Sequence, residues 1–163
     1  MVSGSVETKT ADSLGLASQY INLNALLTNL GVNGNLKVLA VPCNQFGKQE
    51  PGASLVEIKN GIKYVRPGGG YVPAFNLTEK MDVNGASENK FFTFVKSRCP
   101  PMSHTIGDAS YLFWAPIKTT DVQWNFEKFL IDKRGVVRYR IRHRIAPDAP
   151  EVTALIAALL NEQ

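Results

Sequence analysis

Hydrophobic residues recur at every third or fourth position in four segments of the chain, the spacing that places them on one face of an α-helix. The clearest pattern covers 16–30, and weaker ones cover 53–63 and 88–96. The last segment, 150–161, begins with Pro and Glu, which suit the first turn of a helix. The pattern predicts four helices, with Ser87 as the N-cap of the third.

Short apolar and β-branched runs between these segments predict β-strands. Residues 36–41 form such a run and end at Pro42, as a buried parallel strand would. Later in the chain, 126–131 and 136–141 flank a four-residue turn that ends with Gly135. Glycine tolerates the positive φ that such turns require, so these two runs predict a β-hairpin.

The order helix, strand, helix, helix, hairpin, helix predicts an α/β fold, a thioredoxin-like sandwich whose mixed central sheet is flanked by helices. Such a sheet needs a central apolar strand directly before the first helix, yet residues 2–13 are mostly Ser, Thr, Gly and charged residues. We therefore expect the N-terminal part of the fold to be truncated. An atypical segment would cover 1–13, and the folded domain would cover 14–163.

Composition narrows the class of protein. With 163 residues, 44% hydrophobic and 20% charged, the chain has the size and composition of one globular domain. Its apolar runs are shorter than the roughly 20 residues that cross a bilayer, and its start has no apolar signal region. We expect no membrane partner and a cytoplasmic location. An extracellular location would require a signal peptide that was lost with the N-terminus.

Charge and metal-ligating residues add two expected absences. The chain has 18 Lys and Arg against 14 Asp and Glu, and this net charge of +4 is too small to argue for nucleic acid. Cys43 and Cys99 have no paired metal spacing, and there are only two histidines. We therefore expect no metal site and no nucleic-acid partner.

The segment Val41–Gly52, Val-Pro-Cys-Asn-Gln-Phe-Gly-Lys-Gln-Glu-Pro-Gly, directly follows the predicted strand 36–41. In α/β sheets, the carboxyl end of a strand opens onto the surface crevice where ligands bind. The neutral amides of Gln45 and Gln49 could hold a polar reaction centre there. The alternative is a turn in which these amides cap backbone groups.

This segment resembles the signature of the glutathione peroxidases. The segment Trp124–Leu130, Trp-Asn-Phe-Glu-Lys-Phe-Leu, also resembles a motif of that family. A third block, Lys63–Gly70, Lys-Tyr-Val-Arg-Pro-Gly-Gly-Gly, resembles a loop of its tetrameric, selenium-type members. The blocks occur in the family's order, and the resemblance runs from about Gly15 to the C-terminal helix.

The resemblance implies an antioxidant oxidoreductase that reduces hydrogen peroxide and organic hydroperoxides with two glutathiones. Glutathione is then a co-substrate, and no separate cofactor is expected. The family surrounds an oxidisable selenocysteine or cysteine with a glutamine, a tryptophan and an asparagine, which match Gln49, Trp124 and Asn125. Such a nucleophile must be an anion at neutral pH, and neighbouring N–H donors stabilise it. The alternative for Trp124 is core packing.

The nucleophile that the resemblance requires is absent from the sequence. One alignment places Leu14 at its position, and another places a deletion directly before Gly15. We therefore predict that the chain as given is inactive. It is either a pseudo-enzyme, acting as a glutathione-binding or structural protein, or the product of a gene model that skipped a selenocysteine codon. The second account is favoured, because the polar run 2–13 would replace a central strand as well as the nucleophile.

Four arginines alternate with other residues over Arg138–Arg144, so a strand would place them on one face. That face is either solvated or binds carboxylates, and glutathione carries two. Nucleic acid is a less suitable ligand, because no exposed aromatic side chains on which bases could stack accompany these arginines. The resemblance carries glutathione binding over to Arg66, Arg140 and Arg144, although His143 stands where some family members have arginine.

Three further expectations concern single features. The resemblance of the Lys63–Gly70 loop implies contact with another subunit, hence a homodimer or homotetramer. Cys43, directly after a buried strand, is expected to be a packed thiol, whereas Cys99 is expected to be exposed and inert. Asn76 begins a glycosylation sequon, which matters only in a secreted protein.

Overall fold

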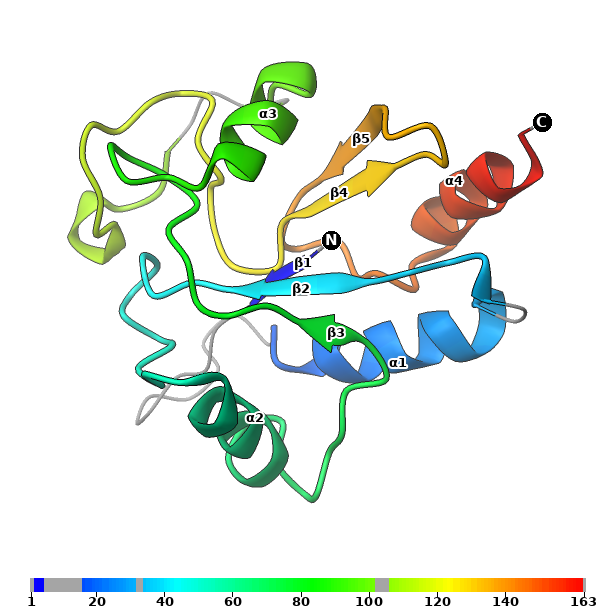
Figure 1. The fold of residues 1–163 in the computed structure, drawn as a ribbon, viewed down its shortest axis with the longest axis horizontal. Coiled ribbons are helices and arrows are strands. Elements are labelled where there is room, and N and C mark those ends of the chain that lie inside the picture. The colour runs from blue at the N-terminus through cyan, green and yellow to red at the C-terminus, as the bar shows by residue number, and fades with distance from the viewer. Residues whose placement is uncertain (1, 5–15, 32–33, 102–105, 163) are drawn as a thin grey trace.

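The computed structural model describes residues 2–4, 16–31, 34–101 and 106–162 (Figure 1). The elements, in chain order, are β1 (Val2–Gly4), α1 (Ser18–Leu30), β2 (Leu39–Pro42), α2 (Leu55–Tyr64), β3 (Asn76–Leu77), α3 (Lys90–Arg98), the 3-10 helix η2 (Ala109–Tyr111), β4 (Lys128–Ile131), β5 (Val137–Ile141) and α4 (Pro150–Asn161).

The strands form one mixed sheet in the order β3-β2-β1-β4-β5. The neighbours β3, β2 and β1 are parallel, whereas β4 runs antiparallel to both β1 and β5. The predicted hairpin is confirmed: β4 and β5 pair, and Gly135 in their turn has a φ of +81°. The predicted α/β class with a mixed sheet is confirmed as well.

The expectation that the central strand is missing is wrong. Residues Val2–Gly4 form β1 between β2 and β4, with Val2 opposite both Ala40 and Lys128. Three residues with the sequence Val-Ser-Gly are too short and too polar to show a buried-strand pattern. A strand therefore occupies the central position of the sheet, although it has only three residues.

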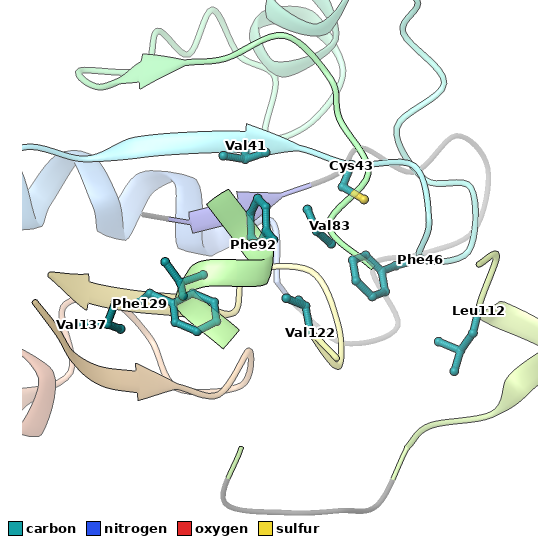
Figure 2. Close-up of a cluster of buried hydrophobic side chains, with 10 residues drawn as sticks. Val41, Cys43, Phe46, Val83, Phe92, Leu112, Val122, Phe129 and Val137 are labelled. Atoms are coloured by element: carbon teal, nitrogen blue, oxygen red, sulfur yellow. The ribbon is translucent and has the colours of Figure 1, made fainter. Parts of the chain in front are cut away.

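Helices cover both faces of the sheet (Figure 1). On one face α1 and α2 contribute to a buried cluster of Tyr20, Leu23, Val38, Ala40, Ile58, Ile62, Phe75 and Phe126. On the other face α3 packs into the cluster of Val41, Cys43, Phe46, Val83, Phe92, Val95, Leu112, Val122, Phe129 and Val137, most of which Figure 2 labels. Side chains of β2 alternate between the two clusters because successive strand residues point to opposite faces.

The predicted helices all form, with small differences at their ends. Residues 150–161 are helical throughout, as predicted. The third helix begins at Lys90, and its N-cap is Asn89, whose side chain accepts a hydrogen bond from Phe91 N at 2.9 Å. The prediction of Ser87 as this cap is therefore wrong. Within the described ranges, no helix is long and apolar enough to cross a lipid bilayer.

Candidate active site

Three chain segments leave the sheet at the same edge. Because β1, β2 and β5 run in one direction and β4 in the other, the carboxyl ends of the first three lie beside the amino end of β4. The residues 43–50 follow β2, 123–127 precede β4, and 142–144 follow β5. This edge, which we call the site edge, therefore gathers the predicted catalytic residues and two of the predicted glutathione-binding arginines.

Gln49 and Asn125 meet across 76 positions of sequence. The Asn125 Nδ2 atom donates a hydrogen bond to Gln49 Oε1 at 2.8 Å, which leaves Nε2 as the donating end of the Gln49 side chain. Asn125 is only 2% exposed, and its Oδ1 atom is buried with no hydrogen-bond partner. A buried polar atom of this kind is costly in a fold and is a feature of functional sites.

The backbone beside each of these residues has unusual torsion angles. Gly47 and Lys48, directly before Gln49, have φ values of +62° and +53°. A Cβ atom on Gly47 would approach the Gln49 side chain to 3.2 Å, so glycine leaves room for the amide. Phe126, directly after Asn125, has a φ of +60°, an outlier for a bulky side chain. Such strain collects at functional sites.

Trp124 is half-buried beside this amide pair. Its ring lies 5.8 Å from the Phe46 ring and 6.4 Å from the Tyr111 ring, centroid to centroid. Phe46 is fully buried in the cluster of Figure 2, so the indole rests on the core rather than within it. The structure thus places the three predicted catalytic residues together at the site edge.

A buried ion pair anchors the turn that carries Trp124 and Asn125. The Glu127 carboxylate accepts hydrogen bonds from Gln123 N at 2.8 Å and from Arg140 Nε. The Arg140 guanidinium also donates to the carbonyls of Thr120 at 3.1 Å and Asp121 at 2.7 Å. Burial raises the pKa of Glu127, and Arg140 opposes that shift. Sequence analysis missed Glu127, although it lies within the Trp124–Leu130 motif.

A second buried network supports the same region from α3. Lys96 Nζ contacts carboxylates of Glu88 and Asp121 and donates to Asn84 Oδ1 at 3.1 Å. The indole Nε1 of Trp114 donates to the other oxygen of Asp121 at 2.8 Å. Each of these charges has an opposite charge in contact, which a buried charge needs. The network ties α3 to the chain that leads to Trp124.

The amino end of α1 also packs against this turn. Tyr20 is buried, and its ring meets the Phe126 ring edge to face, with 5.0 Å between centroids. The chain therefore enters α1 close to Asn125. Leu14 and Gly15, between or at which the sequence analysis expects the missing nucleophile, precede this helix but lie outside the described residues.

The four arginines of the segment Arg138–Arg144 do not share one face of a strand. The strand β5 ends at Ile141, so its alternation does not extend to Arg142 and Arg144, and that expectation is wrong. The Arg140 side chain is 4% exposed and lies over the Phe129 ring on the face that α3 covers. Arg144 is exposed, and Arg66 is half-buried in the loop after α2. Glutathione binding by these residues remains a prediction.

The other candidate side chains, Gln45, Cys43 and Cys99, make contacts that indicate structural roles. Gln45 is buried, and its Oε1 accepts hydrogen bonds from the backbone N of Val83 and of Asn84, both at 3.0 Å, so the capping alternative holds for it. Cys43 is fully buried, as predicted, and burial raises the pKa of its thiol to about 12. Cys99 is half-buried rather than exposed, and burial raises its pKa too. In the described part of the chain, no group of three or more His, Cys, Asp or Glu could hold a metal.

Comparison with known proteins assigns the family. The family model for glutathione peroxidase matches residues 6–96, so the chain belongs to the glutathione peroxidase family. The match begins before Gly15 and thus includes part of the segment 1–13. Glutathione peroxidase 3 of Sapajus apella is 54% identical over 82% of this chain and 58% of its own length. Glutathione peroxidase 6 of Homo sapiens is 58% identical over 75% of this chain and 54% of its own. The chain therefore spans little more than half the length of these relatives.

Solved structures confirm the fold. The crystal structure of Trgpx in apo form superposes with a TM-score of 0.63 and 22% identity, covering 99% of this chain and 80% of its own. The structure of GPX1 from T. cruzi gives a TM-score of 0.62 with 22% identity, covering 98% and 78% of the two chains. The predicted thioredoxin-like fold is confirmed by these neighbours.

Proposed function

We propose that Gln49, Trp124 and Asn125 form the anion-stabilising part of a peroxide-reducing site. A selenolate or thiolate placed beside them would attack the hydroperoxide, take one oxygen atom and release water or an alcohol. A first glutathione would displace that oxygen as water, and a second would release glutathione disulfide and restore the anion. The observation that carries this proposal is the Asn125 to Gln49 hydrogen bond, because it fixes the Gln49 amide with Nε2 as its donating end, and N–H donors of this kind stabilise a thiolate or selenolate.

Leu14 favours a second function for the chain as given. A leucine side chain cannot be oxidised to a species that glutathione attacks, so we propose no turnover in the unchanged sequence. The chain would then bind glutathione without consuming it. Arg66 and Arg144 are the proposed carboxylate ligands, whereas the buried contacts of Arg140 favour a positioning role. Hydroperoxide and glutathione are the proposed small-molecule partners.

We further propose that the loop after α2 contacts another copy of the chain. Gly68, Gly69 and Gly70 all have positive φ, and the apolar side chains of Tyr64, Val65 and Val72 are between 58% and 66% exposed. Exposed apolar residues grouped at a helix end and in the loop after it are typical of protein interfaces. Sedimentation at micromolar concentration should give a dimer or tetramer, and Val65→Glu with Val72→Glu should shift it toward monomer. A monomeric unchanged protein would contradict this assignment.

The catalytic proposal is tested by installing the missing nucleophile. Leu14→Cys should give glutathione-dependent reduction of hydrogen peroxide, while the unchanged protein should give none above background. Adding Gln49→Ala should lower that rate at least about tenfold, since removing one anion-stabilising donor from an active site costs roughly that much or more. Adding Asn60→Ala, an exposed amide on α2, is the matched control and should leave the rate unchanged. Activity in the unchanged protein would contradict the assignment of position 14.

A further inference from the structure

Exposed aromatic side chains lie at the site edge, next to the proposed catalytic residues. Tyr111 and Phe113 are 54% and 43% exposed, although a phenylalanine side chain is most often buried. The Tyr111 ring meets the Trp124 indole edge to face, with 6.4 Å between centroids. We call Trp124, Tyr111 and Phe113 the aromatic row. One end of this row is therefore a residue of the candidate active site.

Backbone pairing with the chain before Gln49 explains why these rings are exposed. Leu112 forms an antiparallel bridge with Phe46, and both side chains are buried in the cluster of Figure 2. Leu112 has extended backbone angles, with φ −109° and ψ 113°. Successive residues of an extended segment point to opposite faces, so Tyr111 and Phe113 both point away from this cluster. Two residues so placed lie roughly 7 Å apart along one face.

A cation lies at the other end of the aromatic row. The Lys48 Nζ atom lies 4.6 Å from the centroid of the Phe113 ring, which is a cation–π contact. Lys48 is exposed, and among the described residues no carboxylate pairs with its ammonium. The carboxylate of Asp108, three residues before Tyr111, accepts hydrogen bonds from Ser110 N at 2.9 Å and Ser110 Oγ at 2.8 Å. An anionic ligand group would therefore bind at the Lys48 end of the row.

We propose that the aromatic row binds a long-chain carboxylate, with the apolar chain across the rings and the carboxylate on the Lys48 ammonium. A chain that covers the rings removes apolar surface of both partners from water. A short carboxylate would leave the rings uncovered, and a neutral chain would leave the ammonium unpaired. The combination of an exposed apolar surface with one lysine therefore selects a ligand that has both parts.

A hydroperoxide of such a carboxylate would also be a substrate, and this part rests on the proposed peroxide reduction. Bound along the row, it would bring its peroxide group to the Trp124 end. The proposed thiolate or selenolate would take the outer oxygen with its proton, and the O–O bond would break with its electrons on the inner oxygen. A proton from water would complete the hydroxy acid, and two glutathiones would restore the anion. Tyr111, Phe113 and Lys48 would then determine specificity.

Binding is measured in the unchanged protein, so the result does not depend on a nucleophile. The probe is dodecanoate, titrated at concentrations below those at which it forms micelles and followed by isothermal titration calorimetry. We expect saturable binding with a Kd below about 1 mM. Butanoate keeps the carboxylate but lacks most of the chain, so it should bind at least about tenfold more weakly.

Ring variants test the location of the chain. Tyr111→Ser combined with Phe113→Ser should raise the Kd for dodecanoate at least about fivefold, because the exposed apolar surface is then lost. Phe94 on α3 is the matched control, since its ring is also 43% exposed and has the Arg98 guanidinium over it. Phe94→Ser should change the Kd less than about twofold, because it lies outside the aromatic row.

Charge variants test the location of the carboxylate. Lys48→Glu should raise the Kd for dodecanoate at least about fivefold, because the carboxylate then faces a like charge. Lys90→Glu makes the same change of net charge at an exposed position on α3 and should change the Kd less than about twofold. Equal effects of the two variants would show that dodecanoate responds to net charge alone and would overturn the proposal.

The Leu14→Cys protein adds a test of specificity. Its ratio of kcat/KM for linoleic acid hydroperoxide to that for hydrogen peroxide should fall at least about fivefold with Tyr111→Ser and Phe113→Ser, through a higher KM for the long-chain substrate. Dodecanoate binding as expected in a protein whose Leu14→Cys variant is inactive would support the binding site and contradict the peroxide proposal. Absence of saturable dodecanoate binding, or an unchanged Kd in the ring variant, would overturn the inference. Loss of self-association in a ring variant whose parent does not bind dodecanoate would also overturn it and assign the row to a subunit interface.

Discussion

The two edges of the sheet differ in the side chains that line them and in how tightly these are packed. At the site edge, polar side chains are buried and held in place: Glu127 and Arg140 form an ion pair, and Asn125 donates to Gln49. At the opposite edge, an apolar cavity separates β2 from β4. Rigid placement of polar side chains suits chemistry on a small group, and the cavity at the other edge offers no such polar arrangement. The comparison places the buried polar contacts of the domain at one edge of the sheet and an apolar cavity at the other.

The largest expected effect comes from breaking the buried ion pair at the site edge. Arg140→Met should lower the free energy of unfolding by about 3–5 kcal/mol, because it leaves the Glu127 carboxylate buried and unpaired. Adding Glu127→Gln should recover part of the loss, since the orphaned charge is then gone. Urea unfolding measures both variants. A loss below about 1 kcal/mol for Arg140→Met would show that the pair behaves as an exposed one.

The same leucine truncation should cost different amounts at the two edges. Leu112, at the site edge, is 8% exposed and packs in the cluster of Figure 2, so Leu112→Ala should cost about 2–5 kcal/mol. Leu159 is half-buried and lines the cavity at the opposite edge, so Leu159→Ala removes few packing contacts and should cost about 1 kcal/mol or less. Thermal unfolding of the pair gives the ratio. Equal losses would show that the residues around the cavity are tightly packed in solution.

Acid should weaken the two edges in separate pH ranges. At the site edge, burial and the nearby Arg144, Arg142 and Lys128 lower the pKa of His143 from 6.5 to about 4. The unfolded chain then binds the extra proton, so stability falls as the pH drops from 6.5 to 4. At the other edge, hydrogen bonds led by that from Val136 N lower the pKa of Asp132 from 3.8 to about 2. Its stabilisation is present above pH 3.8 and is lost toward pH 2.

Variants separate these two ranges. His143→Gln should flatten the stability profile between pH 6.5 and 4, and Asp132→Asn should flatten it between pH 3.8 and 2. Denaturant midpoints measured against pH give both profiles. Should His143→Gln leave the slope of the upper range unchanged, His143 would be titrating normally in the folded state.

Some elements of this molecule could be predicted from the sequence and others could not, for physical reasons. The helix 150–161 has a clear period and Pro at its start, and both signals are local. The strand β1 carries no such signal, because three residues cannot show a period. Arg140 was expected on an open face, because alternation along a strand does not reveal that α3 and the Thr120–Asp121 turn cover it.

The residues of the candidate site also fall into those that the sequence predicted and those that it did not. Gln49, Trp124 and Asn125 were predicted by resemblance, and the structure adds their geometry. The positive φ of Phe126 and the role of Glu127 depend on contacts between distant segments, which no local pattern encodes. The cavity between β2 and β4 is lined by segments far apart in the sequence, so only the assembled sheet shows it.

The pKa of a thiol at position 14 tests the central claim most directly. The claim is that the site edge stabilises an anion beside Gln49 before glutathione is involved. The thiols of Cys43 and Cys99 have raised pKa values, so thiolate absorbance of Leu14→Cys, taken against the unchanged protein, reports the new thiol. The account predicts a pKa below the ordinary value of about 8.5 that rises when Gln49→Ala is added. A pKa at or above about 8.5, unaffected by Gln49→Ala, would contradict it.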